Sequence, residues 1–249
     1  MQQTPAPTKA MPENWRTGLA IVAHPDDLEY GAAAAIAKWT AQGKKIDYVM
    51  VSKGEAGIDG MEPSEVGRLR SREEINAARV VGVETVEFLD HVDGVIEYGP
   101  RLRRDLSRAI RRHRPDVVMT INHHLQFFSG HLNMADHRWV GLAVFDAARD
   151  AGNRWIFPEL LEEGLEPWNE VRFVAVFGST IPTHVVDVSE HWETGLASLR
   201  EHKVYLESLG DVGNSPFEFL TAHAREAGAA FGCRYASYAE LVLINEPFA

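Results

Sequence analysis

The chain has 249 residues, of which 45% are hydrophobic and 24% are charged, a balance typical of a globular protein with a substantial core. Acidic residues outnumber basic ones by 36 to 25, and the net charge of -11 argues against binding to nucleic acids or to anionic lipid surfaces. The only cysteine is Cys233, so an intrachain disulfide and a thiolate metal cluster are both excluded, and a cytoplasmic location is expected.

The first residues do not resemble a targeting segment. Residues 1–15 are rich in proline and polar side chains, and we expect a flexible tail there. We expect residues 16–249 to form a single domain. The most apolar early run, residues 31–37, ends at Lys38, so the sequence predicts no membrane span.

Buried strands and amphipathic helices alternate along the first three-fifths of the chain. Predicted strands occupy residues 19–23, 46–52, 85–89 and 116–121. Predicted helices occupy residues 29–42, 64–81, 100–113 and 134–151. This alternation predicts an α/β fold with a Rossmann-like, doubly wound and mostly parallel sheet.

The pattern loosens after Gly152. Residues 173–177 and 184–188 are predicted strands, and residues 189–209 are a predicted helix. The rest mixes glycine, alanine and aromatic residues without a clear period. We therefore expect a smaller C-terminal α+β extension.

A polar turn, His24-Pro25-Asp26-Asp27, follows the first predicted strand. Ligands of open parallel sheets bind beyond the carboxyl ends of the strands, where this turn lies. One imidazole and two carboxylates suit a zinc-type ion, with one carboxylate free to move a proton. Alternatively, the two aspartates cap the following helix, and local chemistry leaves both interpretations open.

A second polar cluster follows the strand predicted at residues 116–121. A catalytic zinc ion takes three protein ligands and an open position, which His24, Asp27 and one histidine of this cluster would supply. His137 is the best candidate, because a helix start beside the crevice holds a ligand rigidly. The alternative is a set of surface histidines on a long loop. The cluster comprises His123, His124, His131, Asp136 and His137.

These residues resemble a known family, the LmbE-like or PIG-L deacetylases. The sequence Ala-His-Pro-Asp-Asp at residues 23–27 is similar to the family signature. The likeness runs from about residue 17 to residue 209, and the order of so many parts makes it specific. Further matching segments are residues 54–57, Arg70 with Glu73, residues 81–83, residues 93–94 and residues 133–141.

The resemblance implies zinc-dependent hydrolysis of an N-acyl group, usually an acetyl group on an N-acetylglucosamine-type sugar. Zinc increases the acidity of a water molecule and polarises the acyl oxygen. The general base would pass the water proton to the leaving amine. Carried over by position, the zinc ligands are His24, Asp27 and His137, the general base is Asp26, and the sugar contacts are Arg70 and Asp93.

Two departures from the family pattern stand out. The first histidine of the family's His-Pro-Asp-His motif, which is thought to steady the charged tetrahedral intermediate, is replaced by Met134. A thioether is neither an acid nor a cation. We expect another histidine to take over, with His131 nearest in sequence and His123, His124 or His184 behind it. Asp136, beside His137, is a further candidate catalytic residue.

The second departure lies in the late helix, where Gly195 and the segment His-Lys-Val-Tyr at residues 202–205 replace a family lysine and a His-x-x-Gln motif. Three alternatives to a sugar deacetylase stay open. They are a metal amidase on another acyl amide, such as a glycopeptide or a thiol conjugate, a sugar-binding protein without activity, and a two-metal phosphoesterase. Another divalent transition metal is an alternative to zinc. A homo-oligomer is also left open.

Overall fold

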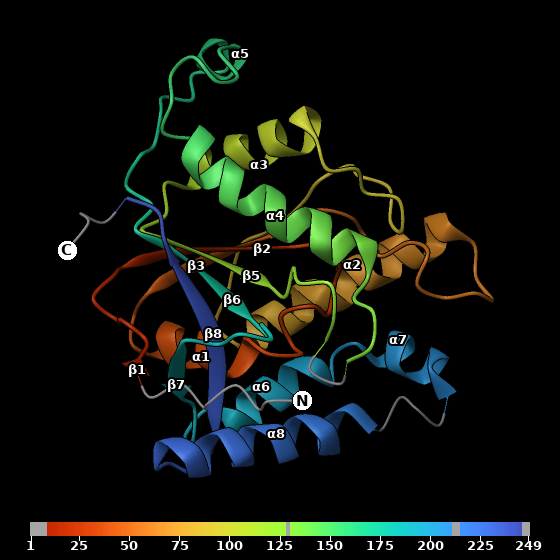
Figure 1. Cartoon of the computed structure of the whole chain (residues 1–249). Coiled ribbons are helices and arrows are strands. Elements are labelled where there is room, and N and C mark those ends of the chain that lie inside the picture. Colours follow the sequence, from red (N-terminus) through yellow and green to blue (C-terminus); the bar gives the residue numbers. More distant parts are fainter. Residues whose placement is uncertain (1–8, 128–129, 211–214, 246–249) are drawn as a thin grey trace.

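The computed structural model describes residues 9–127, 130–210 and 215–245. Over these ranges, eight strands form one sheet in the order β1-β7-β8-β6-β5-β2-β3-β4 (Figure 1). The strands are β1 (Lys9–Ala10), β2 (Thr17–Val22), β3 (Lys45–Met50), β4 (Val86–Phe88), β5 (Val117–Ile121), β6 (Phe173–Phe177), β7 (His184–Asp187) and β8 (Ala236–Leu243). The helices are α1 (Ala33–Ala41), α2 (Pro63–Val80), α3 (Pro100–His113), α4 (Ala135–Asp150), α5 (Glu159–Glu162), α6 (Trp192–Leu199), α7 (Lys203–Ser208) and α8 (Ser215–Phe231).

Most strand pairs are parallel, and the predicted fold class is confirmed. Strands β2, β3, β4, β5 and β6 run in the same direction, and β1 pairs with β7 in parallel. Strand β8 is antiparallel to both β6 and β7. The C-terminal part thus extends the same sheet.

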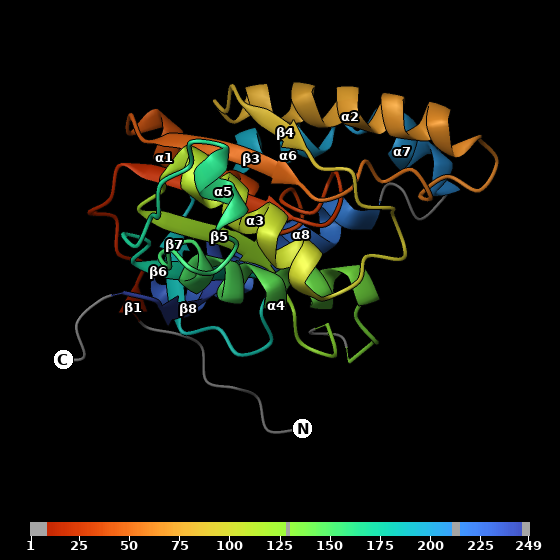
Figure 2. The same cartoon turned by 90° about the horizontal axis from the view of Figure 1, so that it is seen from above.

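Helices cover both faces of the sheet (Figures 1 and 2). Alternate residues of β2 belong to different cores, with Ala20 in one and Leu19 and Ile21 in the other. Helices α3 and α4 contact each other on one face, and α6 contacts α1 and α2 on the other. This two-sided burial explains why the central strands are apolar without a break.

The order of the central strands creates a crevice. The chain passes from β2 to β3 and β4 on one side, then returns to add β5 on the other side of β2. The direction in which the chain adds strands to the sheet therefore reverses between β2 and β5. Side chains that follow these two strands meet at the same edge of the sheet.

The predicted flexible tail is wrong for residues 9–15. Strand β1 pairs with β7, and Met11 and Trp15 are buried in the core. The Trp15 ring meets Trp39 edge-on, with centroids 5.1 Å apart. The prediction failed because the polar composition of this segment gives no sign that its two apolar side chains are buried. Residues 1–8 lie outside the described residues.

The predicted helix over residues 189–209 is divided into α6 and α7. At the break, His202 is fully buried beside Glu29 and Glu74, and its backbone ψ of 51° lies outside the helical range. The Val204 N–H group then donates to Glu73 Oε1 over 2.7 Å at the start of α7.

Close packing explains the glycine that departs from the family pattern in α6. A Cβ atom at Gly195 would lie 2.8 Å from the Ala34 backbone nitrogen of α1. A lysine there would force the two helices apart. None of the described helices is long and apolar enough to cross a membrane.

Candidate metal centre and cavity

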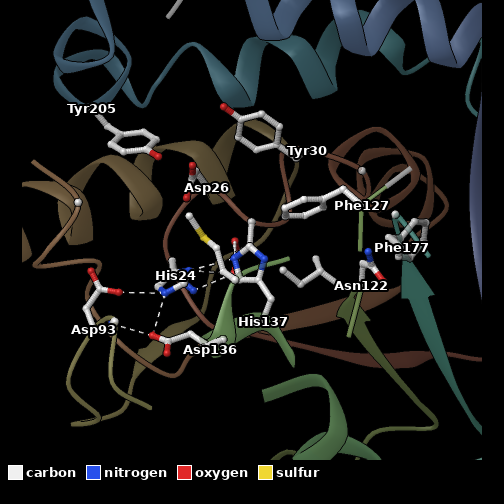
Figure 3. Close-up of a pocket in the computed structure, with 18 of the residues that line it drawn as sticks. His24, Asp26, Tyr30, Asp93, Asn122, Phe127, Asp136, His137, Phe177 and Tyr205 are labelled. Carbon is white, nitrogen blue, oxygen red and sulfur yellow. Dashed lines mark hydrogen bonds and ion pairs between the residues drawn. The ribbon is translucent and has the colours of Figure 1, made fainter. Parts of the chain in front are cut away.

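A cavity of about 670 Å³ opens at the carboxyl ends of β2 and β5. The turn after β2 supplies His24, and the segment after β5 supplies Asn122. Figure 3 shows side chains from both connections and from the start of α4 pointing into this space. The site therefore lies where the strand order predicts it.

Three ligand-type side chains meet in the cavity: His24, Asp27 and His137. His24 Nδ1 lies 3.2 Å from His137 Nε2, which in turn lies 3.0 Å from Asp27 Oδ1. His24 Nδ1 and Asp27 Oδ2 are 3.7 Å apart. A tetrahedral zinc ion with bonds of about 2.0–2.1 Å holds its ligand atoms roughly 3.3 Å apart, so this donor set fits such an ion.

An oxygen atom holds the second ring nitrogen of each histidine. His24 Nε2 lies 2.9 Å from Asp93 Oδ1 and 3.3 Å from Asp136 Oδ2 (Figure 3). His137 Nδ1 lies 3.1 Å from Asn133 Oδ1. Contacts of this kind set the tautomer and orientation of metal-binding imidazoles. They leave His24 Nδ1 and His137 Nε2 directed at a common point.

The two carboxylates beside His24 are also engaged by backbone N–H groups. Asp136 Oδ2 accepts from Gly94 over 2.7 Å, and Oδ1 accepts from Ile96 over 3.1 Å. Asp93 Oδ2 accepts from Ala56 over 2.8 Å. Asp93 and Asp136 are also grouped around the same histidine, and three of their four carboxylate oxygen atoms accept from backbone N–H groups. This arrangement suits groups that orient the imidazole.

The surrounding charges act strongly on the ligand side chains. Burial lowers the pKa of His24, but hydrogen bonds to Asp136, Asp27 and Asp93 outweigh this effect and raise it well above its usual value. Burial raises the pKa of Asp27, and the charge and hydrogen bond of His137 more than reverse this, so the carboxylate stays ionised. An ionised carboxylate is the form that binds a metal.

Asp26 is held in an unusual backbone conformation, with φ at 92°. Its N–H group donates to Glu74 Oε2 over 3.1 Å, and its Oδ1 accepts from Arg70 Nη2 over 2.7 Å. A strained residue of this kind persists only where its surroundings hold it, typically at functional sites. Burial raises the pKa of Asp26 to about 6, although the Arg70 charge opposes that rise.

Arg70 of α2 is surrounded by protein acceptors. Its guanidinium donates to the carbonyl oxygens of Pro25 and Gly54 and stacks on the Tyr205 ring, 4.0 Å from the centroid. Gly54 has a φ of 64°, and a Cβ atom there would lie 2.3 Å from Arg70 Nη1. Glycine is thus required beside this side chain. Arg70 lines the cavity, but the contacts described hold the turn around Asp26.

Much of the remaining cavity wall is apolar. Met134, where the family has a histidine, is 57% exposed. Phe127 and Phe177 lie on the β5 and β6 side of the cavity (Figure 3). The apolar wall comprises Ile121, Phe127, Met134, Phe177 and Phe219.

The structure does not bring the other predicted histidines to the cavity. His131 is exposed and, like His123, His124 and His184, is absent from the described residues that line it. His124 lies instead 2.9 Å from Glu240 of β8. No described histidine therefore occupies the position expected to compensate for Met134.

Some site residues escaped the prediction from sequence. Asn133 stands four residues before His137, a spacing that would have suggested its contact across the start of α4. Tyr205 points its hydroxyl group toward Asp26 (Figure 3). The sequence signal is its place at the end of the segment 202–205, which departs from the family's His-x-x-Gln motif. The charge of Asp26 and burial raise the pKa of Tyr205 to about 12, so its hydroxyl group stays a hydrogen-bond donor.

Comparison with known proteins reveals relatives over most of the chain. Residues 19–148 match the family model described as PIG-L, GlcNAc-PI de-N-acetylase. The diacetylchitobiose deacetylase of Thermococcus kodakarensis is 30% identical over 220 residues, which cover 88% of this chain and 80% of that protein. The 1D-myo-inositol 2-acetamido-2-deoxy-α-D-glucopyranoside deacetylase of Thermomonospora curvata is 25% identical, over 90% of this chain and 91% of that protein.

A solved structure is similar over the same extent. It is the N,N'-diacetylchitobiose deacetylase of Pyrococcus horikoshii in complex with an inhibitor. The alignment has a TM-score of 0.83 and 26% identity, and it covers 92% of this chain and 85% of that one. The similarity thus includes the C-terminal extension as well as the central sheet.

Proposed function

Since the chain belongs to the PIG-L family of GlcNAc-PI de-N-acetylases, we propose that it is a zinc-dependent hydrolase of N-acetylglucosamine-type amino sugars or their conjugates. It would remove the N-acetyl group. The observation that carries this proposal is the donor set of His24, Asp27 and His137 next to the buried carboxylate of Asp26. The relatives are named as deacetylases of diacetylchitobiose and of an acetamido-glucopyranoside.

Asp26 is the proposed general base. A zinc ion held by His24, Asp27 and His137 would supply Lewis acidity to the acyl oxygen and to the attacking water. Asp26 then takes the proton of that water and delivers it to the leaving amine. A carboxyl group with a pKa of about 6 is mostly ionised at neutral pH yet basic enough for this step.

Positioning residues surround the metal ligands and the general base. Arg70 holds one oxygen of Asp26, and Asp93 and Asp136 hold the imidazole of His24. We keep Arg70 and Asp93 as proposed substrate-side residues because both line the cavity, where they shape the space for the sugar. Asp136 would act through His24 rather than on the substrate.

We further propose that Tyr205, rather than His131, donates a hydrogen bond at the reacting amide. Its hydroxyl group faces Asp26 and is protonated at neutral pH, whereas His131 lies outside the cavity lining. A neutral donor stabilises developing negative charge less than an imidazolium does, so a slower enzyme is expected than one with the family histidine.

A second candidate is an amidase for acyl amides with a large apolar substituent. The observation that favours it is the apolar wall that includes Phe127, Met134 and Phe219 beside the metal ligands. Such a wall stabilises apolar ligand surface at roughly 25 cal/mol per Å² buried. Longer acyl chains or apolar aglycones would then react faster than free acetyl sugars.

The test is amine release by zinc-loaded protein from a panel of N-acetylated amino sugars, their conjugates and longer acyl homologues, with Asp26→Asn as the inactive control. Fastest release from acetyl sugars supports the main proposal, and fastest release from long or apolar amides supports the second. Release that persists in Asp26→Asn contradicts the role of the base. A cytoplasmic location, consistent with the single Cys233, is part of this proposal.

A further inference from the structure

A second group of ligand-type side chains lies outside the cavity. It consists of His123 and His124, which follow β5, and Glu240 of β8. One ligand atom of each lies within 4.8 Å of those of the other two, and His124 Nε2 is 2.9 Å from Glu240 Oε2. None of the three lines the cavity that holds the first donor set.

Strand β6 separates the elements that carry these residues. Strand β5 pairs with one side of β6, and β8 pairs with the other, where Glu240 stands opposite Val176. The group therefore bridges segments that are not adjacent in the sheet. A bound ion would link them across the end of β6.

His123 carries an unused polar atom in a fixed ring. Its Nδ1 is buried and has no hydrogen-bond partner among the described residues. The ring meets Phe145 edge-on at 4.9 Å and lies 4.3 Å from the ring of His124. A Cβ atom at Gly141 would lie 2.5 Å from His123 Cβ, so glycine makes room for this side chain.

Glu240 is oriented by a neighbour, as metal-binding carboxylates commonly are. Ser179 Oγ donates to Glu240 Oε2 over 2.6 Å. Two imidazoles and one carboxylate have the same donor chemistry as the set in the cavity, and this composition suits zinc and similar transition-metal ions. The separation of 2.9 Å between His124 and Glu240 also resembles the spacings in the cavity.

We propose that His123, His124 and Glu240 bind a second zinc-type ion, separate from the catalytic one, that ties the segment after β5 to β8. This segment leads directly to the first metal centre. Asn133 Nδ2 donates to the His124 carbonyl oxygen over 2.9 Å, and Asn133 Oδ1 faces His137. The second ion thus stabilises the segment that orients a ligand of the first.

The experiment counts zinc in dialysed, zinc-loaded protein. Wild type should hold about two ions per chain, and both His124→Ala and Glu240→Gln should hold about one. His137→Ala should also hold about one, and the combination of His137→Ala with Glu240→Gln should hold none. His223→Ala, which removes an exposed histidine of α8, is the matched control and should match wild type.

Thermal unfolding provides a readout that needs no activity. Zinc should raise the Tm of His137→Ala, whose remaining site is the second one, and should leave the Tm of its combination with Glu240→Gln unchanged. Circular dichroism checks that each variant folds. A second ion that survives in both His124→Ala and Glu240→Gln, or a single ion in wild type that His137→Ala removes, overturns the proposal. The ion lost in His137→Ala belongs to the proposed catalytic site alone. The proposed function and the second metal site are therefore tested by different variants, and one can fail without the other.

Discussion

His24 Nδ1 lies 3.2 Å from His137 Nε2, although 113 positions separate the two residues in the chain. The contact exists because β2 and β5 are parallel neighbours, with Gly18 opposite Val117, so the segments that follow them emerge side by side. His24 follows β2 after one residue, and His137 lies in the first turn of α4, the helix after β5. The candidate metal centre is therefore a consequence of the order of the strands.

Orientation of these rings should control metal affinity. Asn133→Ala removes the oxygen atom beside His137 Nδ1, and Asp136→Asn alters the acceptor beside His24 Nε2. Each change should weaken zinc binding by about 10- to 100-fold, as outer partners of metal ligands commonly do. Competition with a chromophoric chelator measures the affinity. Asp59→Asn, in an exposed loop, is the control, and equal affinities in all four proteins would contradict the assigned roles.

Loss of the proposed base should separate catalysis from metal binding. Asp26→Asn keeps the size of the side chain but removes its ability to accept a proton. We expect kcat to fall by about 100- to 10,000-fold, the range for a lost general base. Zinc content should stay at the wild-type level, because Asp26 is not among the proposed ligands. A variant with wild-type kcat would rule out this base.

The hydroxyl group of Tyr205 tests the proposed replacement for the family histidine. Tyr205→Phe retains the ring that stacks on Arg70 but removes the donor. If the hydroxyl group acts on the reacting amide, kcat should fall by roughly 100-fold or more, with little change in KM. Tyr98→Phe, an exposed tyrosine outside the cavity lining, is the control. An unchanged kcat would mean that Tyr205 does not replace the family histidine that is missing at Met134.

His113 should make stability depend on pH. Hydrogen bonds to Asp47 and Glu87, at 2.9 and 3.2 Å, raise the pKa of His113 to about 9 from its ordinary 6.5. Because the folded-state pKa is the higher one, this stabilisation is complete below pH 6.5 and is lost as the pH rises through about 9.

His113→Gln should therefore lower the free energy of unfolding by roughly 1–3 kcal/mol at pH 6 and by much less at pH 10. Urea unfolding at the two pH values measures the difference. His223→Gln, which changes an exposed histidine, serves as the reference. A loss of the same size at both pH values would mean that His113 contributes by packing alone.

The central fold could be predicted because its signals are local. Uninterrupted apolar strands and helices of regular period predicted β2 through α4 with end positions that differ by a few residues. The break at His202 could not be predicted, because the groups beside this buried side chain, Glu29 and Glu74, lie far away in the chain. Strand β1 escaped because only two residues pair, and β8 lacks the alternation that marks a strand with one exposed face.

The candidate metal ligands could be named from sequence because they follow strand ends in a recognisable motif. The roles of their neighbours depend on geometry instead. Sequence position made His131 the nearest substitute for the missing histidine, yet the fold leaves it outside the cavity lining and places Tyr205 beside Asp26. Proximity along a loop does not predict proximity in a cavity, because the path of the loop is set by distant contacts.

The most direct test of the account is to measure acetate and free amine released from an N-acetylglucosamine disaccharide by zinc-loaded protein, by chelator-treated protein and by Asp27→Asn. Asp27→Asn removes the anionic metal ligand while keeping the size of the side chain. We predict equal amounts of acetate and amine from the zinc-loaded protein, little from the other two, and recovery of the chelated protein when zinc is returned. Release that proceeds equally without the metal, or none from any N-acetylated sugar by protein with zinc bound, would contradict the account.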